Sequence, residues 1–184
     1  MNKPANRYSL VIESPLGRLG ILVVNQQVHR IDYLAGSVRL QKASSAFEYR
    51  VVQQLESYFD HPGAGFSVPL ELAGTPFQQR VWQALTEIPA GETLTYGELA
   101  ARLGSGARAV GNACRRNPVS IIVPCHRVVA ASGIGGYSGR TSGPVLDRKR
   151  WLLDHENQLA PALKKPAAAP NSHIDQKNQR NIPA

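Results

Sequence analysis

Residues 119–129 read Val119-Ser120-Ile121-Ile122-Val123-Pro124-Cys125-His126-Arg127-Val128-Val129. The run of Val and Ile is typical of a short buried strand, because β-branched side chains fit a pleated, packed surface. Pro124 cannot donate a ladder hydrogen bond, so the strand should end there. Cys125 is then expected at the end of a rigid element, next to a titratable histidine, where the backbone turns.

The composition describes a packed globular chain. With 184 residues, 42% of them hydrophobic and 18% charged, it has room for one ordinary domain or two small lobes. No apolar run approaches the roughly 18 residues of a membrane span, and residues 1–7 lack the apolar core of a signal peptide. We therefore expect a cytoplasmic protein with no membrane partner.

The two cysteines, Cys114 and Cys125, form no Cys-x-x-Cys pattern. This count argues against a disulfide scaffold and against a zinc site, so we expect neither a metal nor a cofactor. Cys114 falls on an apolar helical stripe and is predicted to be an inert packing residue. Cys125 is left as the candidate reactive thiol.

The positive charge of the chain is concentrated in one stretch. The formal net charge is +8, yet residues 1–94 hold eight basic and eight acidic side chains. Residues 95–150 hold nine basic side chains, eight of them arginine, against Glu98 and Asp147. This asymmetry favours a polyanionic partner. The alternative is a solvated basic face that only aids solubility.

The N-terminal part, residues 1–74, is predicted to be a small α/β lobe. Alternating apolar residues between 7 and 34 indicate an antiparallel meander. Apolar residues at helical spacing between 43 and 60 indicate an amphipathic helix, and residues 66–72 are predicted to form another strand.

The next part, residues 75–158, is predicted to be mostly helical. Thr75-Pro76-Phe77-Gln78 and Thr95-Tyr96-Gly97-Glu98 both resemble capping boxes, which open helices. Trp82 lies on the apolar face of the first helix and should be core. A final helix is expected from Pro144 or Asp147 through Glu156, and residues 159–184 are predicted to be a disordered tail.

Residues 95–116 have the pattern of a helix-turn-helix. A short turn at Gly104-Ser105-Gly106 separates two helical stretches, and the second should end before Asn117-Pro118. Its apolar side carries Val110, Ala113 and Cys114. Its other side is basic and polar, with the members Arg108, Gly111, Asn112, Arg115 and Arg116.

A thiol nucleophile reacts as the thiolate, which nearby cations or a histidine partner favour. His126 and the surrounding arginines could supply this. Adjacent residues of a strand point to opposite faces, so a turn or a bridging water would be needed between Cys125 and His126. Glu156, beyond the apolar anchor of the last helix, is a candidate partner for the imidazole. A buried structural cysteine is the alternative for this segment taken alone.

Pro124-Cys125-His126-Arg127-Val128 resembles the active-site signature of the O6-alkylguanine-DNA alkyltransferases, also called methylated-DNA–protein-cysteine methyltransferases. The similarity is strong over residues 74–156 and loose over the N-terminal lobe. The other matching motifs, in chain order, are Phe77–Trp82, Gly91–Thr93, Thr95–Ala100, Ala107–Gly111, Asn117-Pro118, Gly136–Gly139 and Trp151–Glu156.

The resemblance implies an α+β fold with a ribonuclease H-like N-terminal lobe and a helix-turn-helix C-terminal lobe. It also implies a reaction, in which Cys125 takes the alkyl group irreversibly from O6-alkylguanine in a single turnover, with O4-alkylthymine as a second candidate substrate. His126, held by Glu156, would keep the cysteine thiolate-like through a water. Tyr96 would donate a proton to the departing guanine, and Asn117 would support the turn that places the cysteine.

For the partner, the resemblance implies double-stranded DNA bound through its minor groove, with the damaged base flipped out of the stack. Arg108 would fill the space that the base leaves. The remaining expected DNA contacts are Thr95, Ala107, Ala109, Gly111, Asn112 and Arg115. The residues expected in the base pocket are Val128, Gly136, Tyr137 and Ser138. Tyr137 and Ser138 would border it, and the backbones of Cys125 and Val128 would read the exocyclic amine of the base. A monomer in solution is expected, with cooperative assembly on DNA left open.

Three rival classes remain. A non-catalytic lesion binder of the alkyltransferase-like kind would lack the nucleophile, which Cys125 argues against. A helix-turn-helix transcription factor usually reads the major groove as a dimer, and no dimer helix is evident. A cysteine hydrolase would not bind DNA and would turn over repeatedly.

Overall fold

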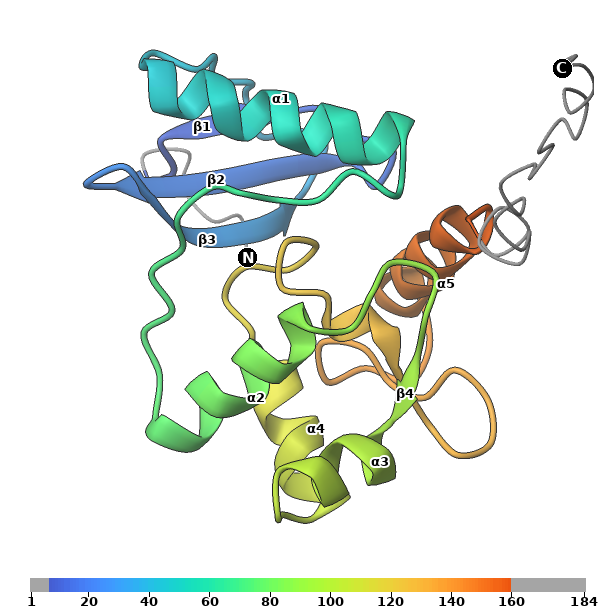
Figure 1. Cartoon of the computed structure of the whole chain (residues 1–184). Helices are drawn as coiled ribbons and strands as arrows, with labels where there is room; N and C mark the ends of the chain where they lie inside the picture. Colours follow the sequence, from blue (N-terminus) through green and yellow to red (C-terminus); the bar gives the residue numbers. More distant parts are fainter. Residues whose placement is uncertain (1–6, 160–184) are drawn as a thin grey trace, which may run out of the picture.

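The computed structural model describes residues 7–159. The N-terminal half begins with an antiparallel sheet in the order β1-β2-β3 (Figure 1), made of β1 (Leu10–Ile12), β2 (Arg18–Val24) and β3 (Gln27–Leu34). Asn25 and Gln26 reverse the chain between β2 and β3, both at positive φ, as a tight hairpin of this hand requires. The predicted meander is confirmed.

Helix α1 (Ala46–Asp60) lies along one face of this sheet (Figure 1). It begins three residues later than the apolar pattern starts, because the Ser45 side chain caps it by accepting a hydrogen bond from the Glu48 backbone N–H. Val51, Leu55 and Tyr58 are fully buried. The helix therefore closes the core of the sheet with one apolar stripe.

The strand predicted for residues 66–72 is wrong. This segment makes a single bridge to β3, in which Val28 donates to the Pro69 carbonyl (2.9 Å) and Glu71 donates to the Val28 carbonyl (3.1 Å). Pro69 has no N–H to extend the ladder, so pairing stops after one step. The segment serves instead as an extended connection to the second half of the chain.

The second half is mostly helical. Its elements are α2 (Pro76–Thr86), β4 (Leu94–Thr95), α3 (Tyr96–Arg102), α4 (Ala107–Arg115), the 3-10 turn η2 (Cys125–Arg127), β5 (Val128–Val129) and α5 (Pro144–Asn157). Both capping boxes predicted from the sequence are formed, at Thr75 and at Thr95. Strands β4 and β5 pair in parallel. The result is an α+β chain with a sheet-and-helix half and a helical half.

The strand predicted for residues 119–123 is also wrong, although the residues are buried as expected. The segment folds into a tight turn in which Val123 donates to the Val119 carbonyl (2.9 Å), and Ile121 lies at φ 79°. The physical reason is the Asn117 side chain. It accepts from the Val119 N–H (3.0 Å) and donates to the Val123 carbonyl (2.7 Å), so one side chain binds both ends of the turn and replaces the hydrogen bonds of a regular strand.

One buried cluster runs through both halves of the described chain, from Leu10 to Leu152. Trp82 belongs to it, as predicted, and its indole N–H donates to the Ala113 carbonyl of α4 (2.9 Å). The backbone of β3 is also hydrogen-bonded to the segment that follows α4, because the Ile31 N–H donates to the Pro118 carbonyl (2.9 Å). The two halves are therefore joined by packing and by a backbone hydrogen bond close to Cys125.

Within residues 7–159, no helix is long and apolar enough to cross a membrane. The tail predicted for residues 159–184 falls, apart from Leu159, outside the described residues. The expected boundary near residue 74 lies in the stretch that leads from Leu72 to the first residue of α2.

Candidate active site

Cys125 is the first residue of η2 and is 3% exposed. The sequence required a turn after Pro124 for the cysteine and histidine to act together, and η2 is such a turn. Burial raises the pKa of the Cys125 thiol, while a hydrogen bond from Asn117 and the charge of Lys149 act in the opposite direction. The thiol is therefore held rigidly, and its ionisation depends on the groups around it.

His126, the next residue of η2, is fully buried. Its Nε2 atom lies 2.9 Å from Oε1 of Glu156, which is itself 1% exposed. The predicted partnership of His126 with Glu156 is thus present in the geometry. It joins η2 to the last helix, α5, from 30 residues further along the chain.

Glu156 receives more donors than the sequence suggested. Arg127 binds both carboxylate oxygens, through Nη2 and Nε, each at 2.9 Å. The Tyr58 hydroxyl donates at 2.7 Å and the Gly91 backbone N–H at 3.3 Å. Burial would raise the pKa of Glu156, but the hydrogen bonds from His126 and Arg127 outweigh it and hold the pKa well below its usual range. Glu156 is therefore an anion.

The charge on Glu156 fixes the tautomer of His126. A carboxylate can only accept, so the imidazole Nε2 carries the proton and Nδ1 presents a lone pair. Burial lowers the pKa of His126, which keeps the ring neutral. Nδ1 is the one buried side-chain nitrogen or oxygen of residues 7–159 that has no hydrogen-bond partner. The ring is thus arranged as a base with a free acceptor site.

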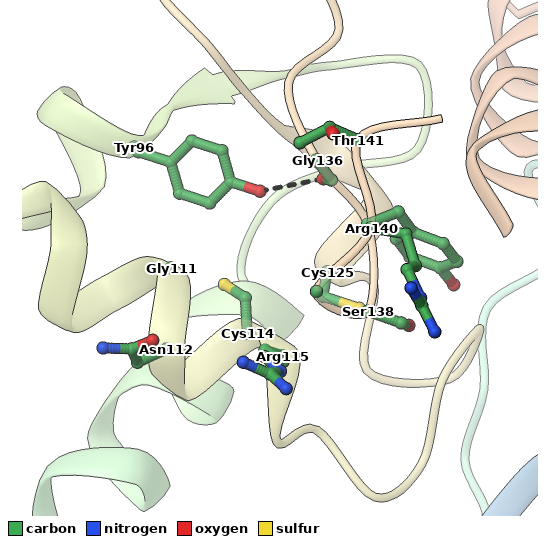
Figure 2. Close-up of a pocket in the computed structure, with 12 residues that line it drawn as sticks. Tyr96, Gly111, Asn112, Cys114, Arg115, Cys125, Gly136, Ser138, Arg140 and Thr141 are labelled. Carbon is green, nitrogen blue, oxygen red and sulfur yellow. Dashed lines mark hydrogen bonds between the residues drawn. The ribbon is translucent and has the colours of Figure 1, made fainter. Parts of the chain in front are cut away.

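A pocket of about 280 Å³ opens in front of Cys125 (Figure 2). Its walls come from α3, α4 and the loop before α5, and the residues that line it are Tyr96, Gly111, Asn112, Cys114, Arg115, Cys125 and 136–141. The Tyr96 hydroxyl donates to the Gly136 carbonyl across the pocket (3.1 Å). The pocket therefore brings together most of the residues predicted to surround the substrate.

Tyr137 and Ser138 both line this pocket, as predicted, but differ in their surroundings. Tyr137 is 3% exposed, and its hydroxyl lies 3.2 Å from that of Tyr33 on β3. Ser138 is exposed at the mouth, at φ 46°. Arg115 lies against the same loop, because a Cβ added to Gly139 would come within 2.5 Å of its Nε atom. Gly139 lies at φ 79°, a backbone conformation that favours glycine.

Lys149 is a site residue that the sequence reasoning missed. It is fully buried on α5, and its ammonium donates to the Val128 carbonyl (2.6 Å) and the Gly136 carbonyl (3.0 Å). Burial lowers its pKa to about 8. Its spacing from Leu146 and Leu152 places it on the buried stripe of the last helix, so the sequence did contain a signal.

Val128 does not line the pocket, although its backbone was predicted to read the exocyclic amine of the base there. It is fully buried in β5, and its carbonyl is bound by Lys149. Cys114, by contrast, was predicted to be packing alone and does reach the pocket wall. Burial raises the pKa of the Cys114 thiol to about 12, which agrees with an inert cysteine.

The predicted DNA contacts fall into two groups. Gly111, Asn112 and Arg115 line the pocket on the side of α4. The other four, Thr95, Ala107, Arg108 and Ala109, do not line the pocket. Residues 107–109 are exposed at the start of α4. The Thr95 hydroxyl accepts from the Glu98 N–H as the cap of α3 (3.1 Å).

Gly111 leaves room on the polar side of α4. A Cβ there would meet only the Tyr96 ring, at 3.9 Å, which is an ordinary contact. Packing within the protein therefore does not require glycine at this position, and its small size is available to an outside partner. Within residues 7–159, no three His, Cys, Asp or Glu side chains gather as a metal site would need.

A buried cysteine in the lining of a pocket, followed by a buried neutral histidine and flanked by a basic helix, is the arrangement expected of a class of protein whose cysteine reacts with a substrate carried by a polyanion. The comparisons narrow this class. Residues 76–158 match the family model for the DNA-binding domain of 6-O-methylguanine DNA methyltransferase. The chain belongs to the methylated-DNA–protein-cysteine methyltransferase family.

Relatives match over most of their length. The chain is 44% identical over 159 residues to a methylated-DNA–protein-cysteine methyltransferase of Mycobacterium tuberculosis, covering 82% of this chain and 93% of the relative. It is 40% identical over 156 residues to the Methanosarcina acetivorans protein of that name, covering 81% and 97%. Both halves of the fold therefore fall within the similarity.

Solved structures of similar proteins have the same fold over most of the chain. The crystal structure of the Mycobacterium tuberculosis O6-methylguanine methyltransferase matches with a TM-score of 0.69 at 40% identity, covering 83% of this chain and 93% of that one. A structure of the Mycobacterium tuberculosis protein in complex with DNA matches with a TM-score of 0.67 at 43% identity, covering 80% and 91%.

Proposed function

We propose that this protein is a methylated-DNA–protein-cysteine methyltransferase that repairs O6-methylguanine in DNA by moving the methyl group onto Cys125. The observation that carries the assignment to this residue is that Cys125 lines the pocket and is followed in the chain by His126, which is buried and paired with Glu156. The membership of the family supports the activity, and the relative crystallised in complex with DNA supports the partner.

The thiol loses its proton first. Its buried surroundings disfavour the thiolate, so a base is needed. Nδ1 of His126 is free to accept, and one water molecule would carry the proton to it from Cys125. Glu156 and Arg127 keep the ring in the tautomer that this step requires. The network of contacts around Glu156 thus acts on the imidazole and touches no substrate atom.

The methyl transfer follows as an in-line displacement. The Cys125 sulfur forms a bond to the methyl carbon while the bond from that carbon to guanine O6 breaks, and its electron pair stays on the base. Tyr96 supplies a proton to the departing guanine, and the proton taken up by His126 replaces it by way of solvent. Burial raises the pKa of Tyr96, so the hydroxyl remains protonated until the base gains negative charge.

The reaction ends after one turnover. The product at Cys125 is a thioether, which is stable to water and to thiols, and the pocket presents no second group able to cleave it. One molecule therefore repairs one lesion and stays alkylated. O4-alkylthymine, which carries an alkyl group on a comparable exocyclic oxygen, is a second candidate substrate.

The DNA approaches along α4. We place the exposed polar side of this helix in the minor groove, with α3 and α4 acting as the helix-turn-helix, and Arg108 in the space left by the flipped base. Arg115 and Asn112 stand at the pocket mouth, where the flipped nucleotide leaves the duplex. A monomer suffices for this arrangement, and cooperative assembly on longer DNA is compatible with it.

The division of the chain follows from these roles. We propose that residues 75–158 form the DNA-binding and active-site lobe and that residues 1–74 form a ribonuclease H-like supporting lobe. The three-stranded antiparallel sheet with α1 on one face supports the second part. The supporting lobe contributes Tyr58 to the Glu156 cluster and Tyr33 to Tyr137.

Stoichiometry tests the proposal. When the protein meets an excess of duplex with radiolabelled O6-methylguanine, transfer should stop at one methyl group per chain, and fresh substrate should add none. Cys125→Ala should accept no label, whereas Cys114→Ala should accept one methyl group. Repeated turnover would indicate a hydrolase, and DNA binding without any transfer would indicate a non-catalytic lesion binder.

A further inference from the structure

A second hollow, of about 460 Å³, lies beside the base pocket, between β3, the end of α4 and the start of α5. Four arginines line it: Arg30 from β3, Arg115 and Arg116 from the end of α4, and Arg148 from α5. We call it the arginine groove. It joins both halves of the chain, and no step of the methyl transfer uses it.

The groove carries an excess of positive charge. Asp32 is the acidic residue in its lining, and it is already engaged, because the Tyr8 hydroxyl donates to it (2.8 Å) and Arg30 lies 3.9 Å away. Among residues 7–159, Arg115, Arg116 and Arg148 form no ion pair with a carboxylate. Four guanidinium groups and one carboxylate line the groove, and like charges in one hollow repel one another, so an anion bound there would relieve that repulsion.

The groove is held open by contacts that leave its arginines available. The Arg148 guanidinium stacks over the Tyr33 ring, 4.4 Å from the ring centre, which fixes its direction while its N–H groups stay free of ion pairs. Arg30 sits next to Ile31, whose N–H binds the Pro118 carbonyl at the exit of α4. The two sides of the groove are therefore fixed relative to each other before any ligand arrives.

The groove is continuous with the base pocket. Arg115 and Ser138 line both, and Tyr33 in the groove is hydrogen-bonded to Tyr137 in the pocket. A nucleotide whose base occupies the pocket must leave its flanking phosphates outside the mouth, and one of the two directions of the strand leads past Arg115 into the groove. Arginine binds phosphate through two parallel hydrogen bonds, which suits this role.

We propose that the arginine groove binds the sugar-phosphate backbone of the damaged strand next to the flipped nucleotide. This extends the DNA interface beyond α4 to Arg148 of α5 and to Arg30 of the otherwise neutral N-terminal lobe. The inference rests on the proposed function, because it takes the strand from the base that enters the pocket.

The test uses the full chain with the double substitution Arg30→Gln and Arg148→Gln, since neither residue lines the base pocket. Binding to a fluorescent duplex is measured by anisotropy from about 50 to about 200 mM salt. Loss of two phosphate contacts should weaken binding about tenfold at the low-salt end and reduce the slope of log affinity against log salt by about 1.8.

The matched control is the double substitution Arg50→Gln and Arg150→Gln, which removes the same charge from α1 and from the exposed side of α5, outside the groove. It should leave the salt slope within about 0.3 of the wild-type value. Arg30→Lys with Arg148→Lys keeps the charge and should retain most of the slope. If the lysine variant loses as much as the glutamine variant, charge is not the cause and the inference is wrong.

Transfer of the alkyl group from free O6-benzylguanine separates this inference from the proposed function. The glutamine variant should react with the free base at the wild-type rate, because the pocket is unchanged. Wild-type affinity and salt slope in that variant would overturn the groove as a DNA site while leaving the methyltransferase assignment intact. A change in sedimentation mass in place of a change in slope would indicate a protein partner and would also overturn it. Absence of transfer in the wild type would overturn the proposed function instead.

Discussion

The buried cluster around Glu156 and the exposed side of α4 differ in whether their charged side chains are paired within the protein. In the cluster, Glu156 binds His126, Arg127 and Tyr58, all within 3 Å and shielded from solvent. On α4, Arg108 and Arg115 are exposed and make no ion pair with another residue of the described chain.

The difference shows which region has all its charge partners within the protein and which region needs a ligand to supply them. A buried charge must be paired inside the protein, since an unpaired one is strongly unfavourable, and such a network fixes one geometry. Exposed arginines remain solvated and can wait for an outside anion. The cluster therefore fixes the histidine that serves the chemistry, while the outer side of α4 gains its partners only when DNA binds.

The largest effect on stability is expected from a substitution of Glu156 in the buried cluster. The substitution Glu156→Gln removes the charge that pairs with Arg127 and leaves a buried guanidinium without a counter-ion. We expect a loss of about 3–5 kcal/mol in the free energy of unfolding, measured by urea denaturation at neutral pH. Methyl transfer should also slow, because the amide no longer fixes the tautomer of His126. A loss of stability below about 1 kcal/mol would mean that the buried pair does not act as described.

The exposed side of α4 should behave differently. Arg108→Ala is expected to slow repair of duplex DNA about 10- to 100-fold, which corresponds to about 1–3 kcal/mol. It should leave thermal stability and the reaction with free O6-benzylguanine unchanged, since Arg108 is not part of the pocket. Arg80→Ala, on α2, is the control and should affect neither substrate. Equal losses on duplex and free base would contradict the assigned role of Arg108.

Low pH should reduce the free energy of unfolding through the two titratable groups of the buried cluster, His126 and Glu156. The pKa of His126 is lowered by burial, so the unfolded chain takes up a proton at His126 before the folded chain does. The contribution of neutral His126 to the free energy of unfolding is therefore largest above the ordinary histidine pKa of about 6.5. As the pH drops below that value, the free energy of unfolding falls by up to about 1.4 kcal/mol per pH unit.

Glu156, whose pKa is depressed, adds a second loss below the ordinary glutamate pKa of about 4.3. Urea denaturation at a series of pH values from about 7 down to about 3 measures both effects. In His126→Gln the first loss should be absent, so the stability difference from the wild type shrinks as the pH falls from 6.5. A difference that stays constant over this range would show that His126 is not held neutral.

The smallest effect is expected at an exposed ion pair. Arg150 and Asp147 on α5 are 2.8 Å apart, with more than half of each side chain exposed. Asp147→Asn should change the free energy of unfolding by less than about 1 kcal/mol. The same measurement as for Glu156→Gln applies, so the two variants compare a buried and an exposed carboxylate on one helix. Similar losses in both would remove the distinction between the two regions.

Local sequence signals predicted the helices well. The capping boxes at Thr75 and Thr95 satisfy the first N–H groups of a helix with side chains from the same few residues, and Pro144 begins a helix without an N–H that needs a partner. In each case a short stretch contains the whole signal. The pairing of His126 with Glu156 was also predicted, but through the resemblance and the position of Glu156 beyond an apolar anchor.

Features that depend on distant partners were not predicted. Residues 119–123 looked like a strand because burial and β-branching are also satisfied in a turn, and nothing local indicated that the Asn117 side chain would bind both ends of it. The clamp made by Lys149 depends on carbonyls of Val128 and Gly136. The arginine groove depends on the contact of β3 with the turn after α4. In each case the deciding group comes from another element.

The most direct test of the account is the mass of the cysteine peptides after reaction with a duplex that contains O6-methylguanine. Trypsin places Cys125 in the peptide 117–127 and Cys114 in the peptide 109–115, so the two thiols of one pocket are read separately. We predict that peptide 117–127 gains one CH₂ unit and that peptide 109–115 keeps its mass. Methyl on Cys114, or transfer that persists in Cys125→Ala, would contradict the account.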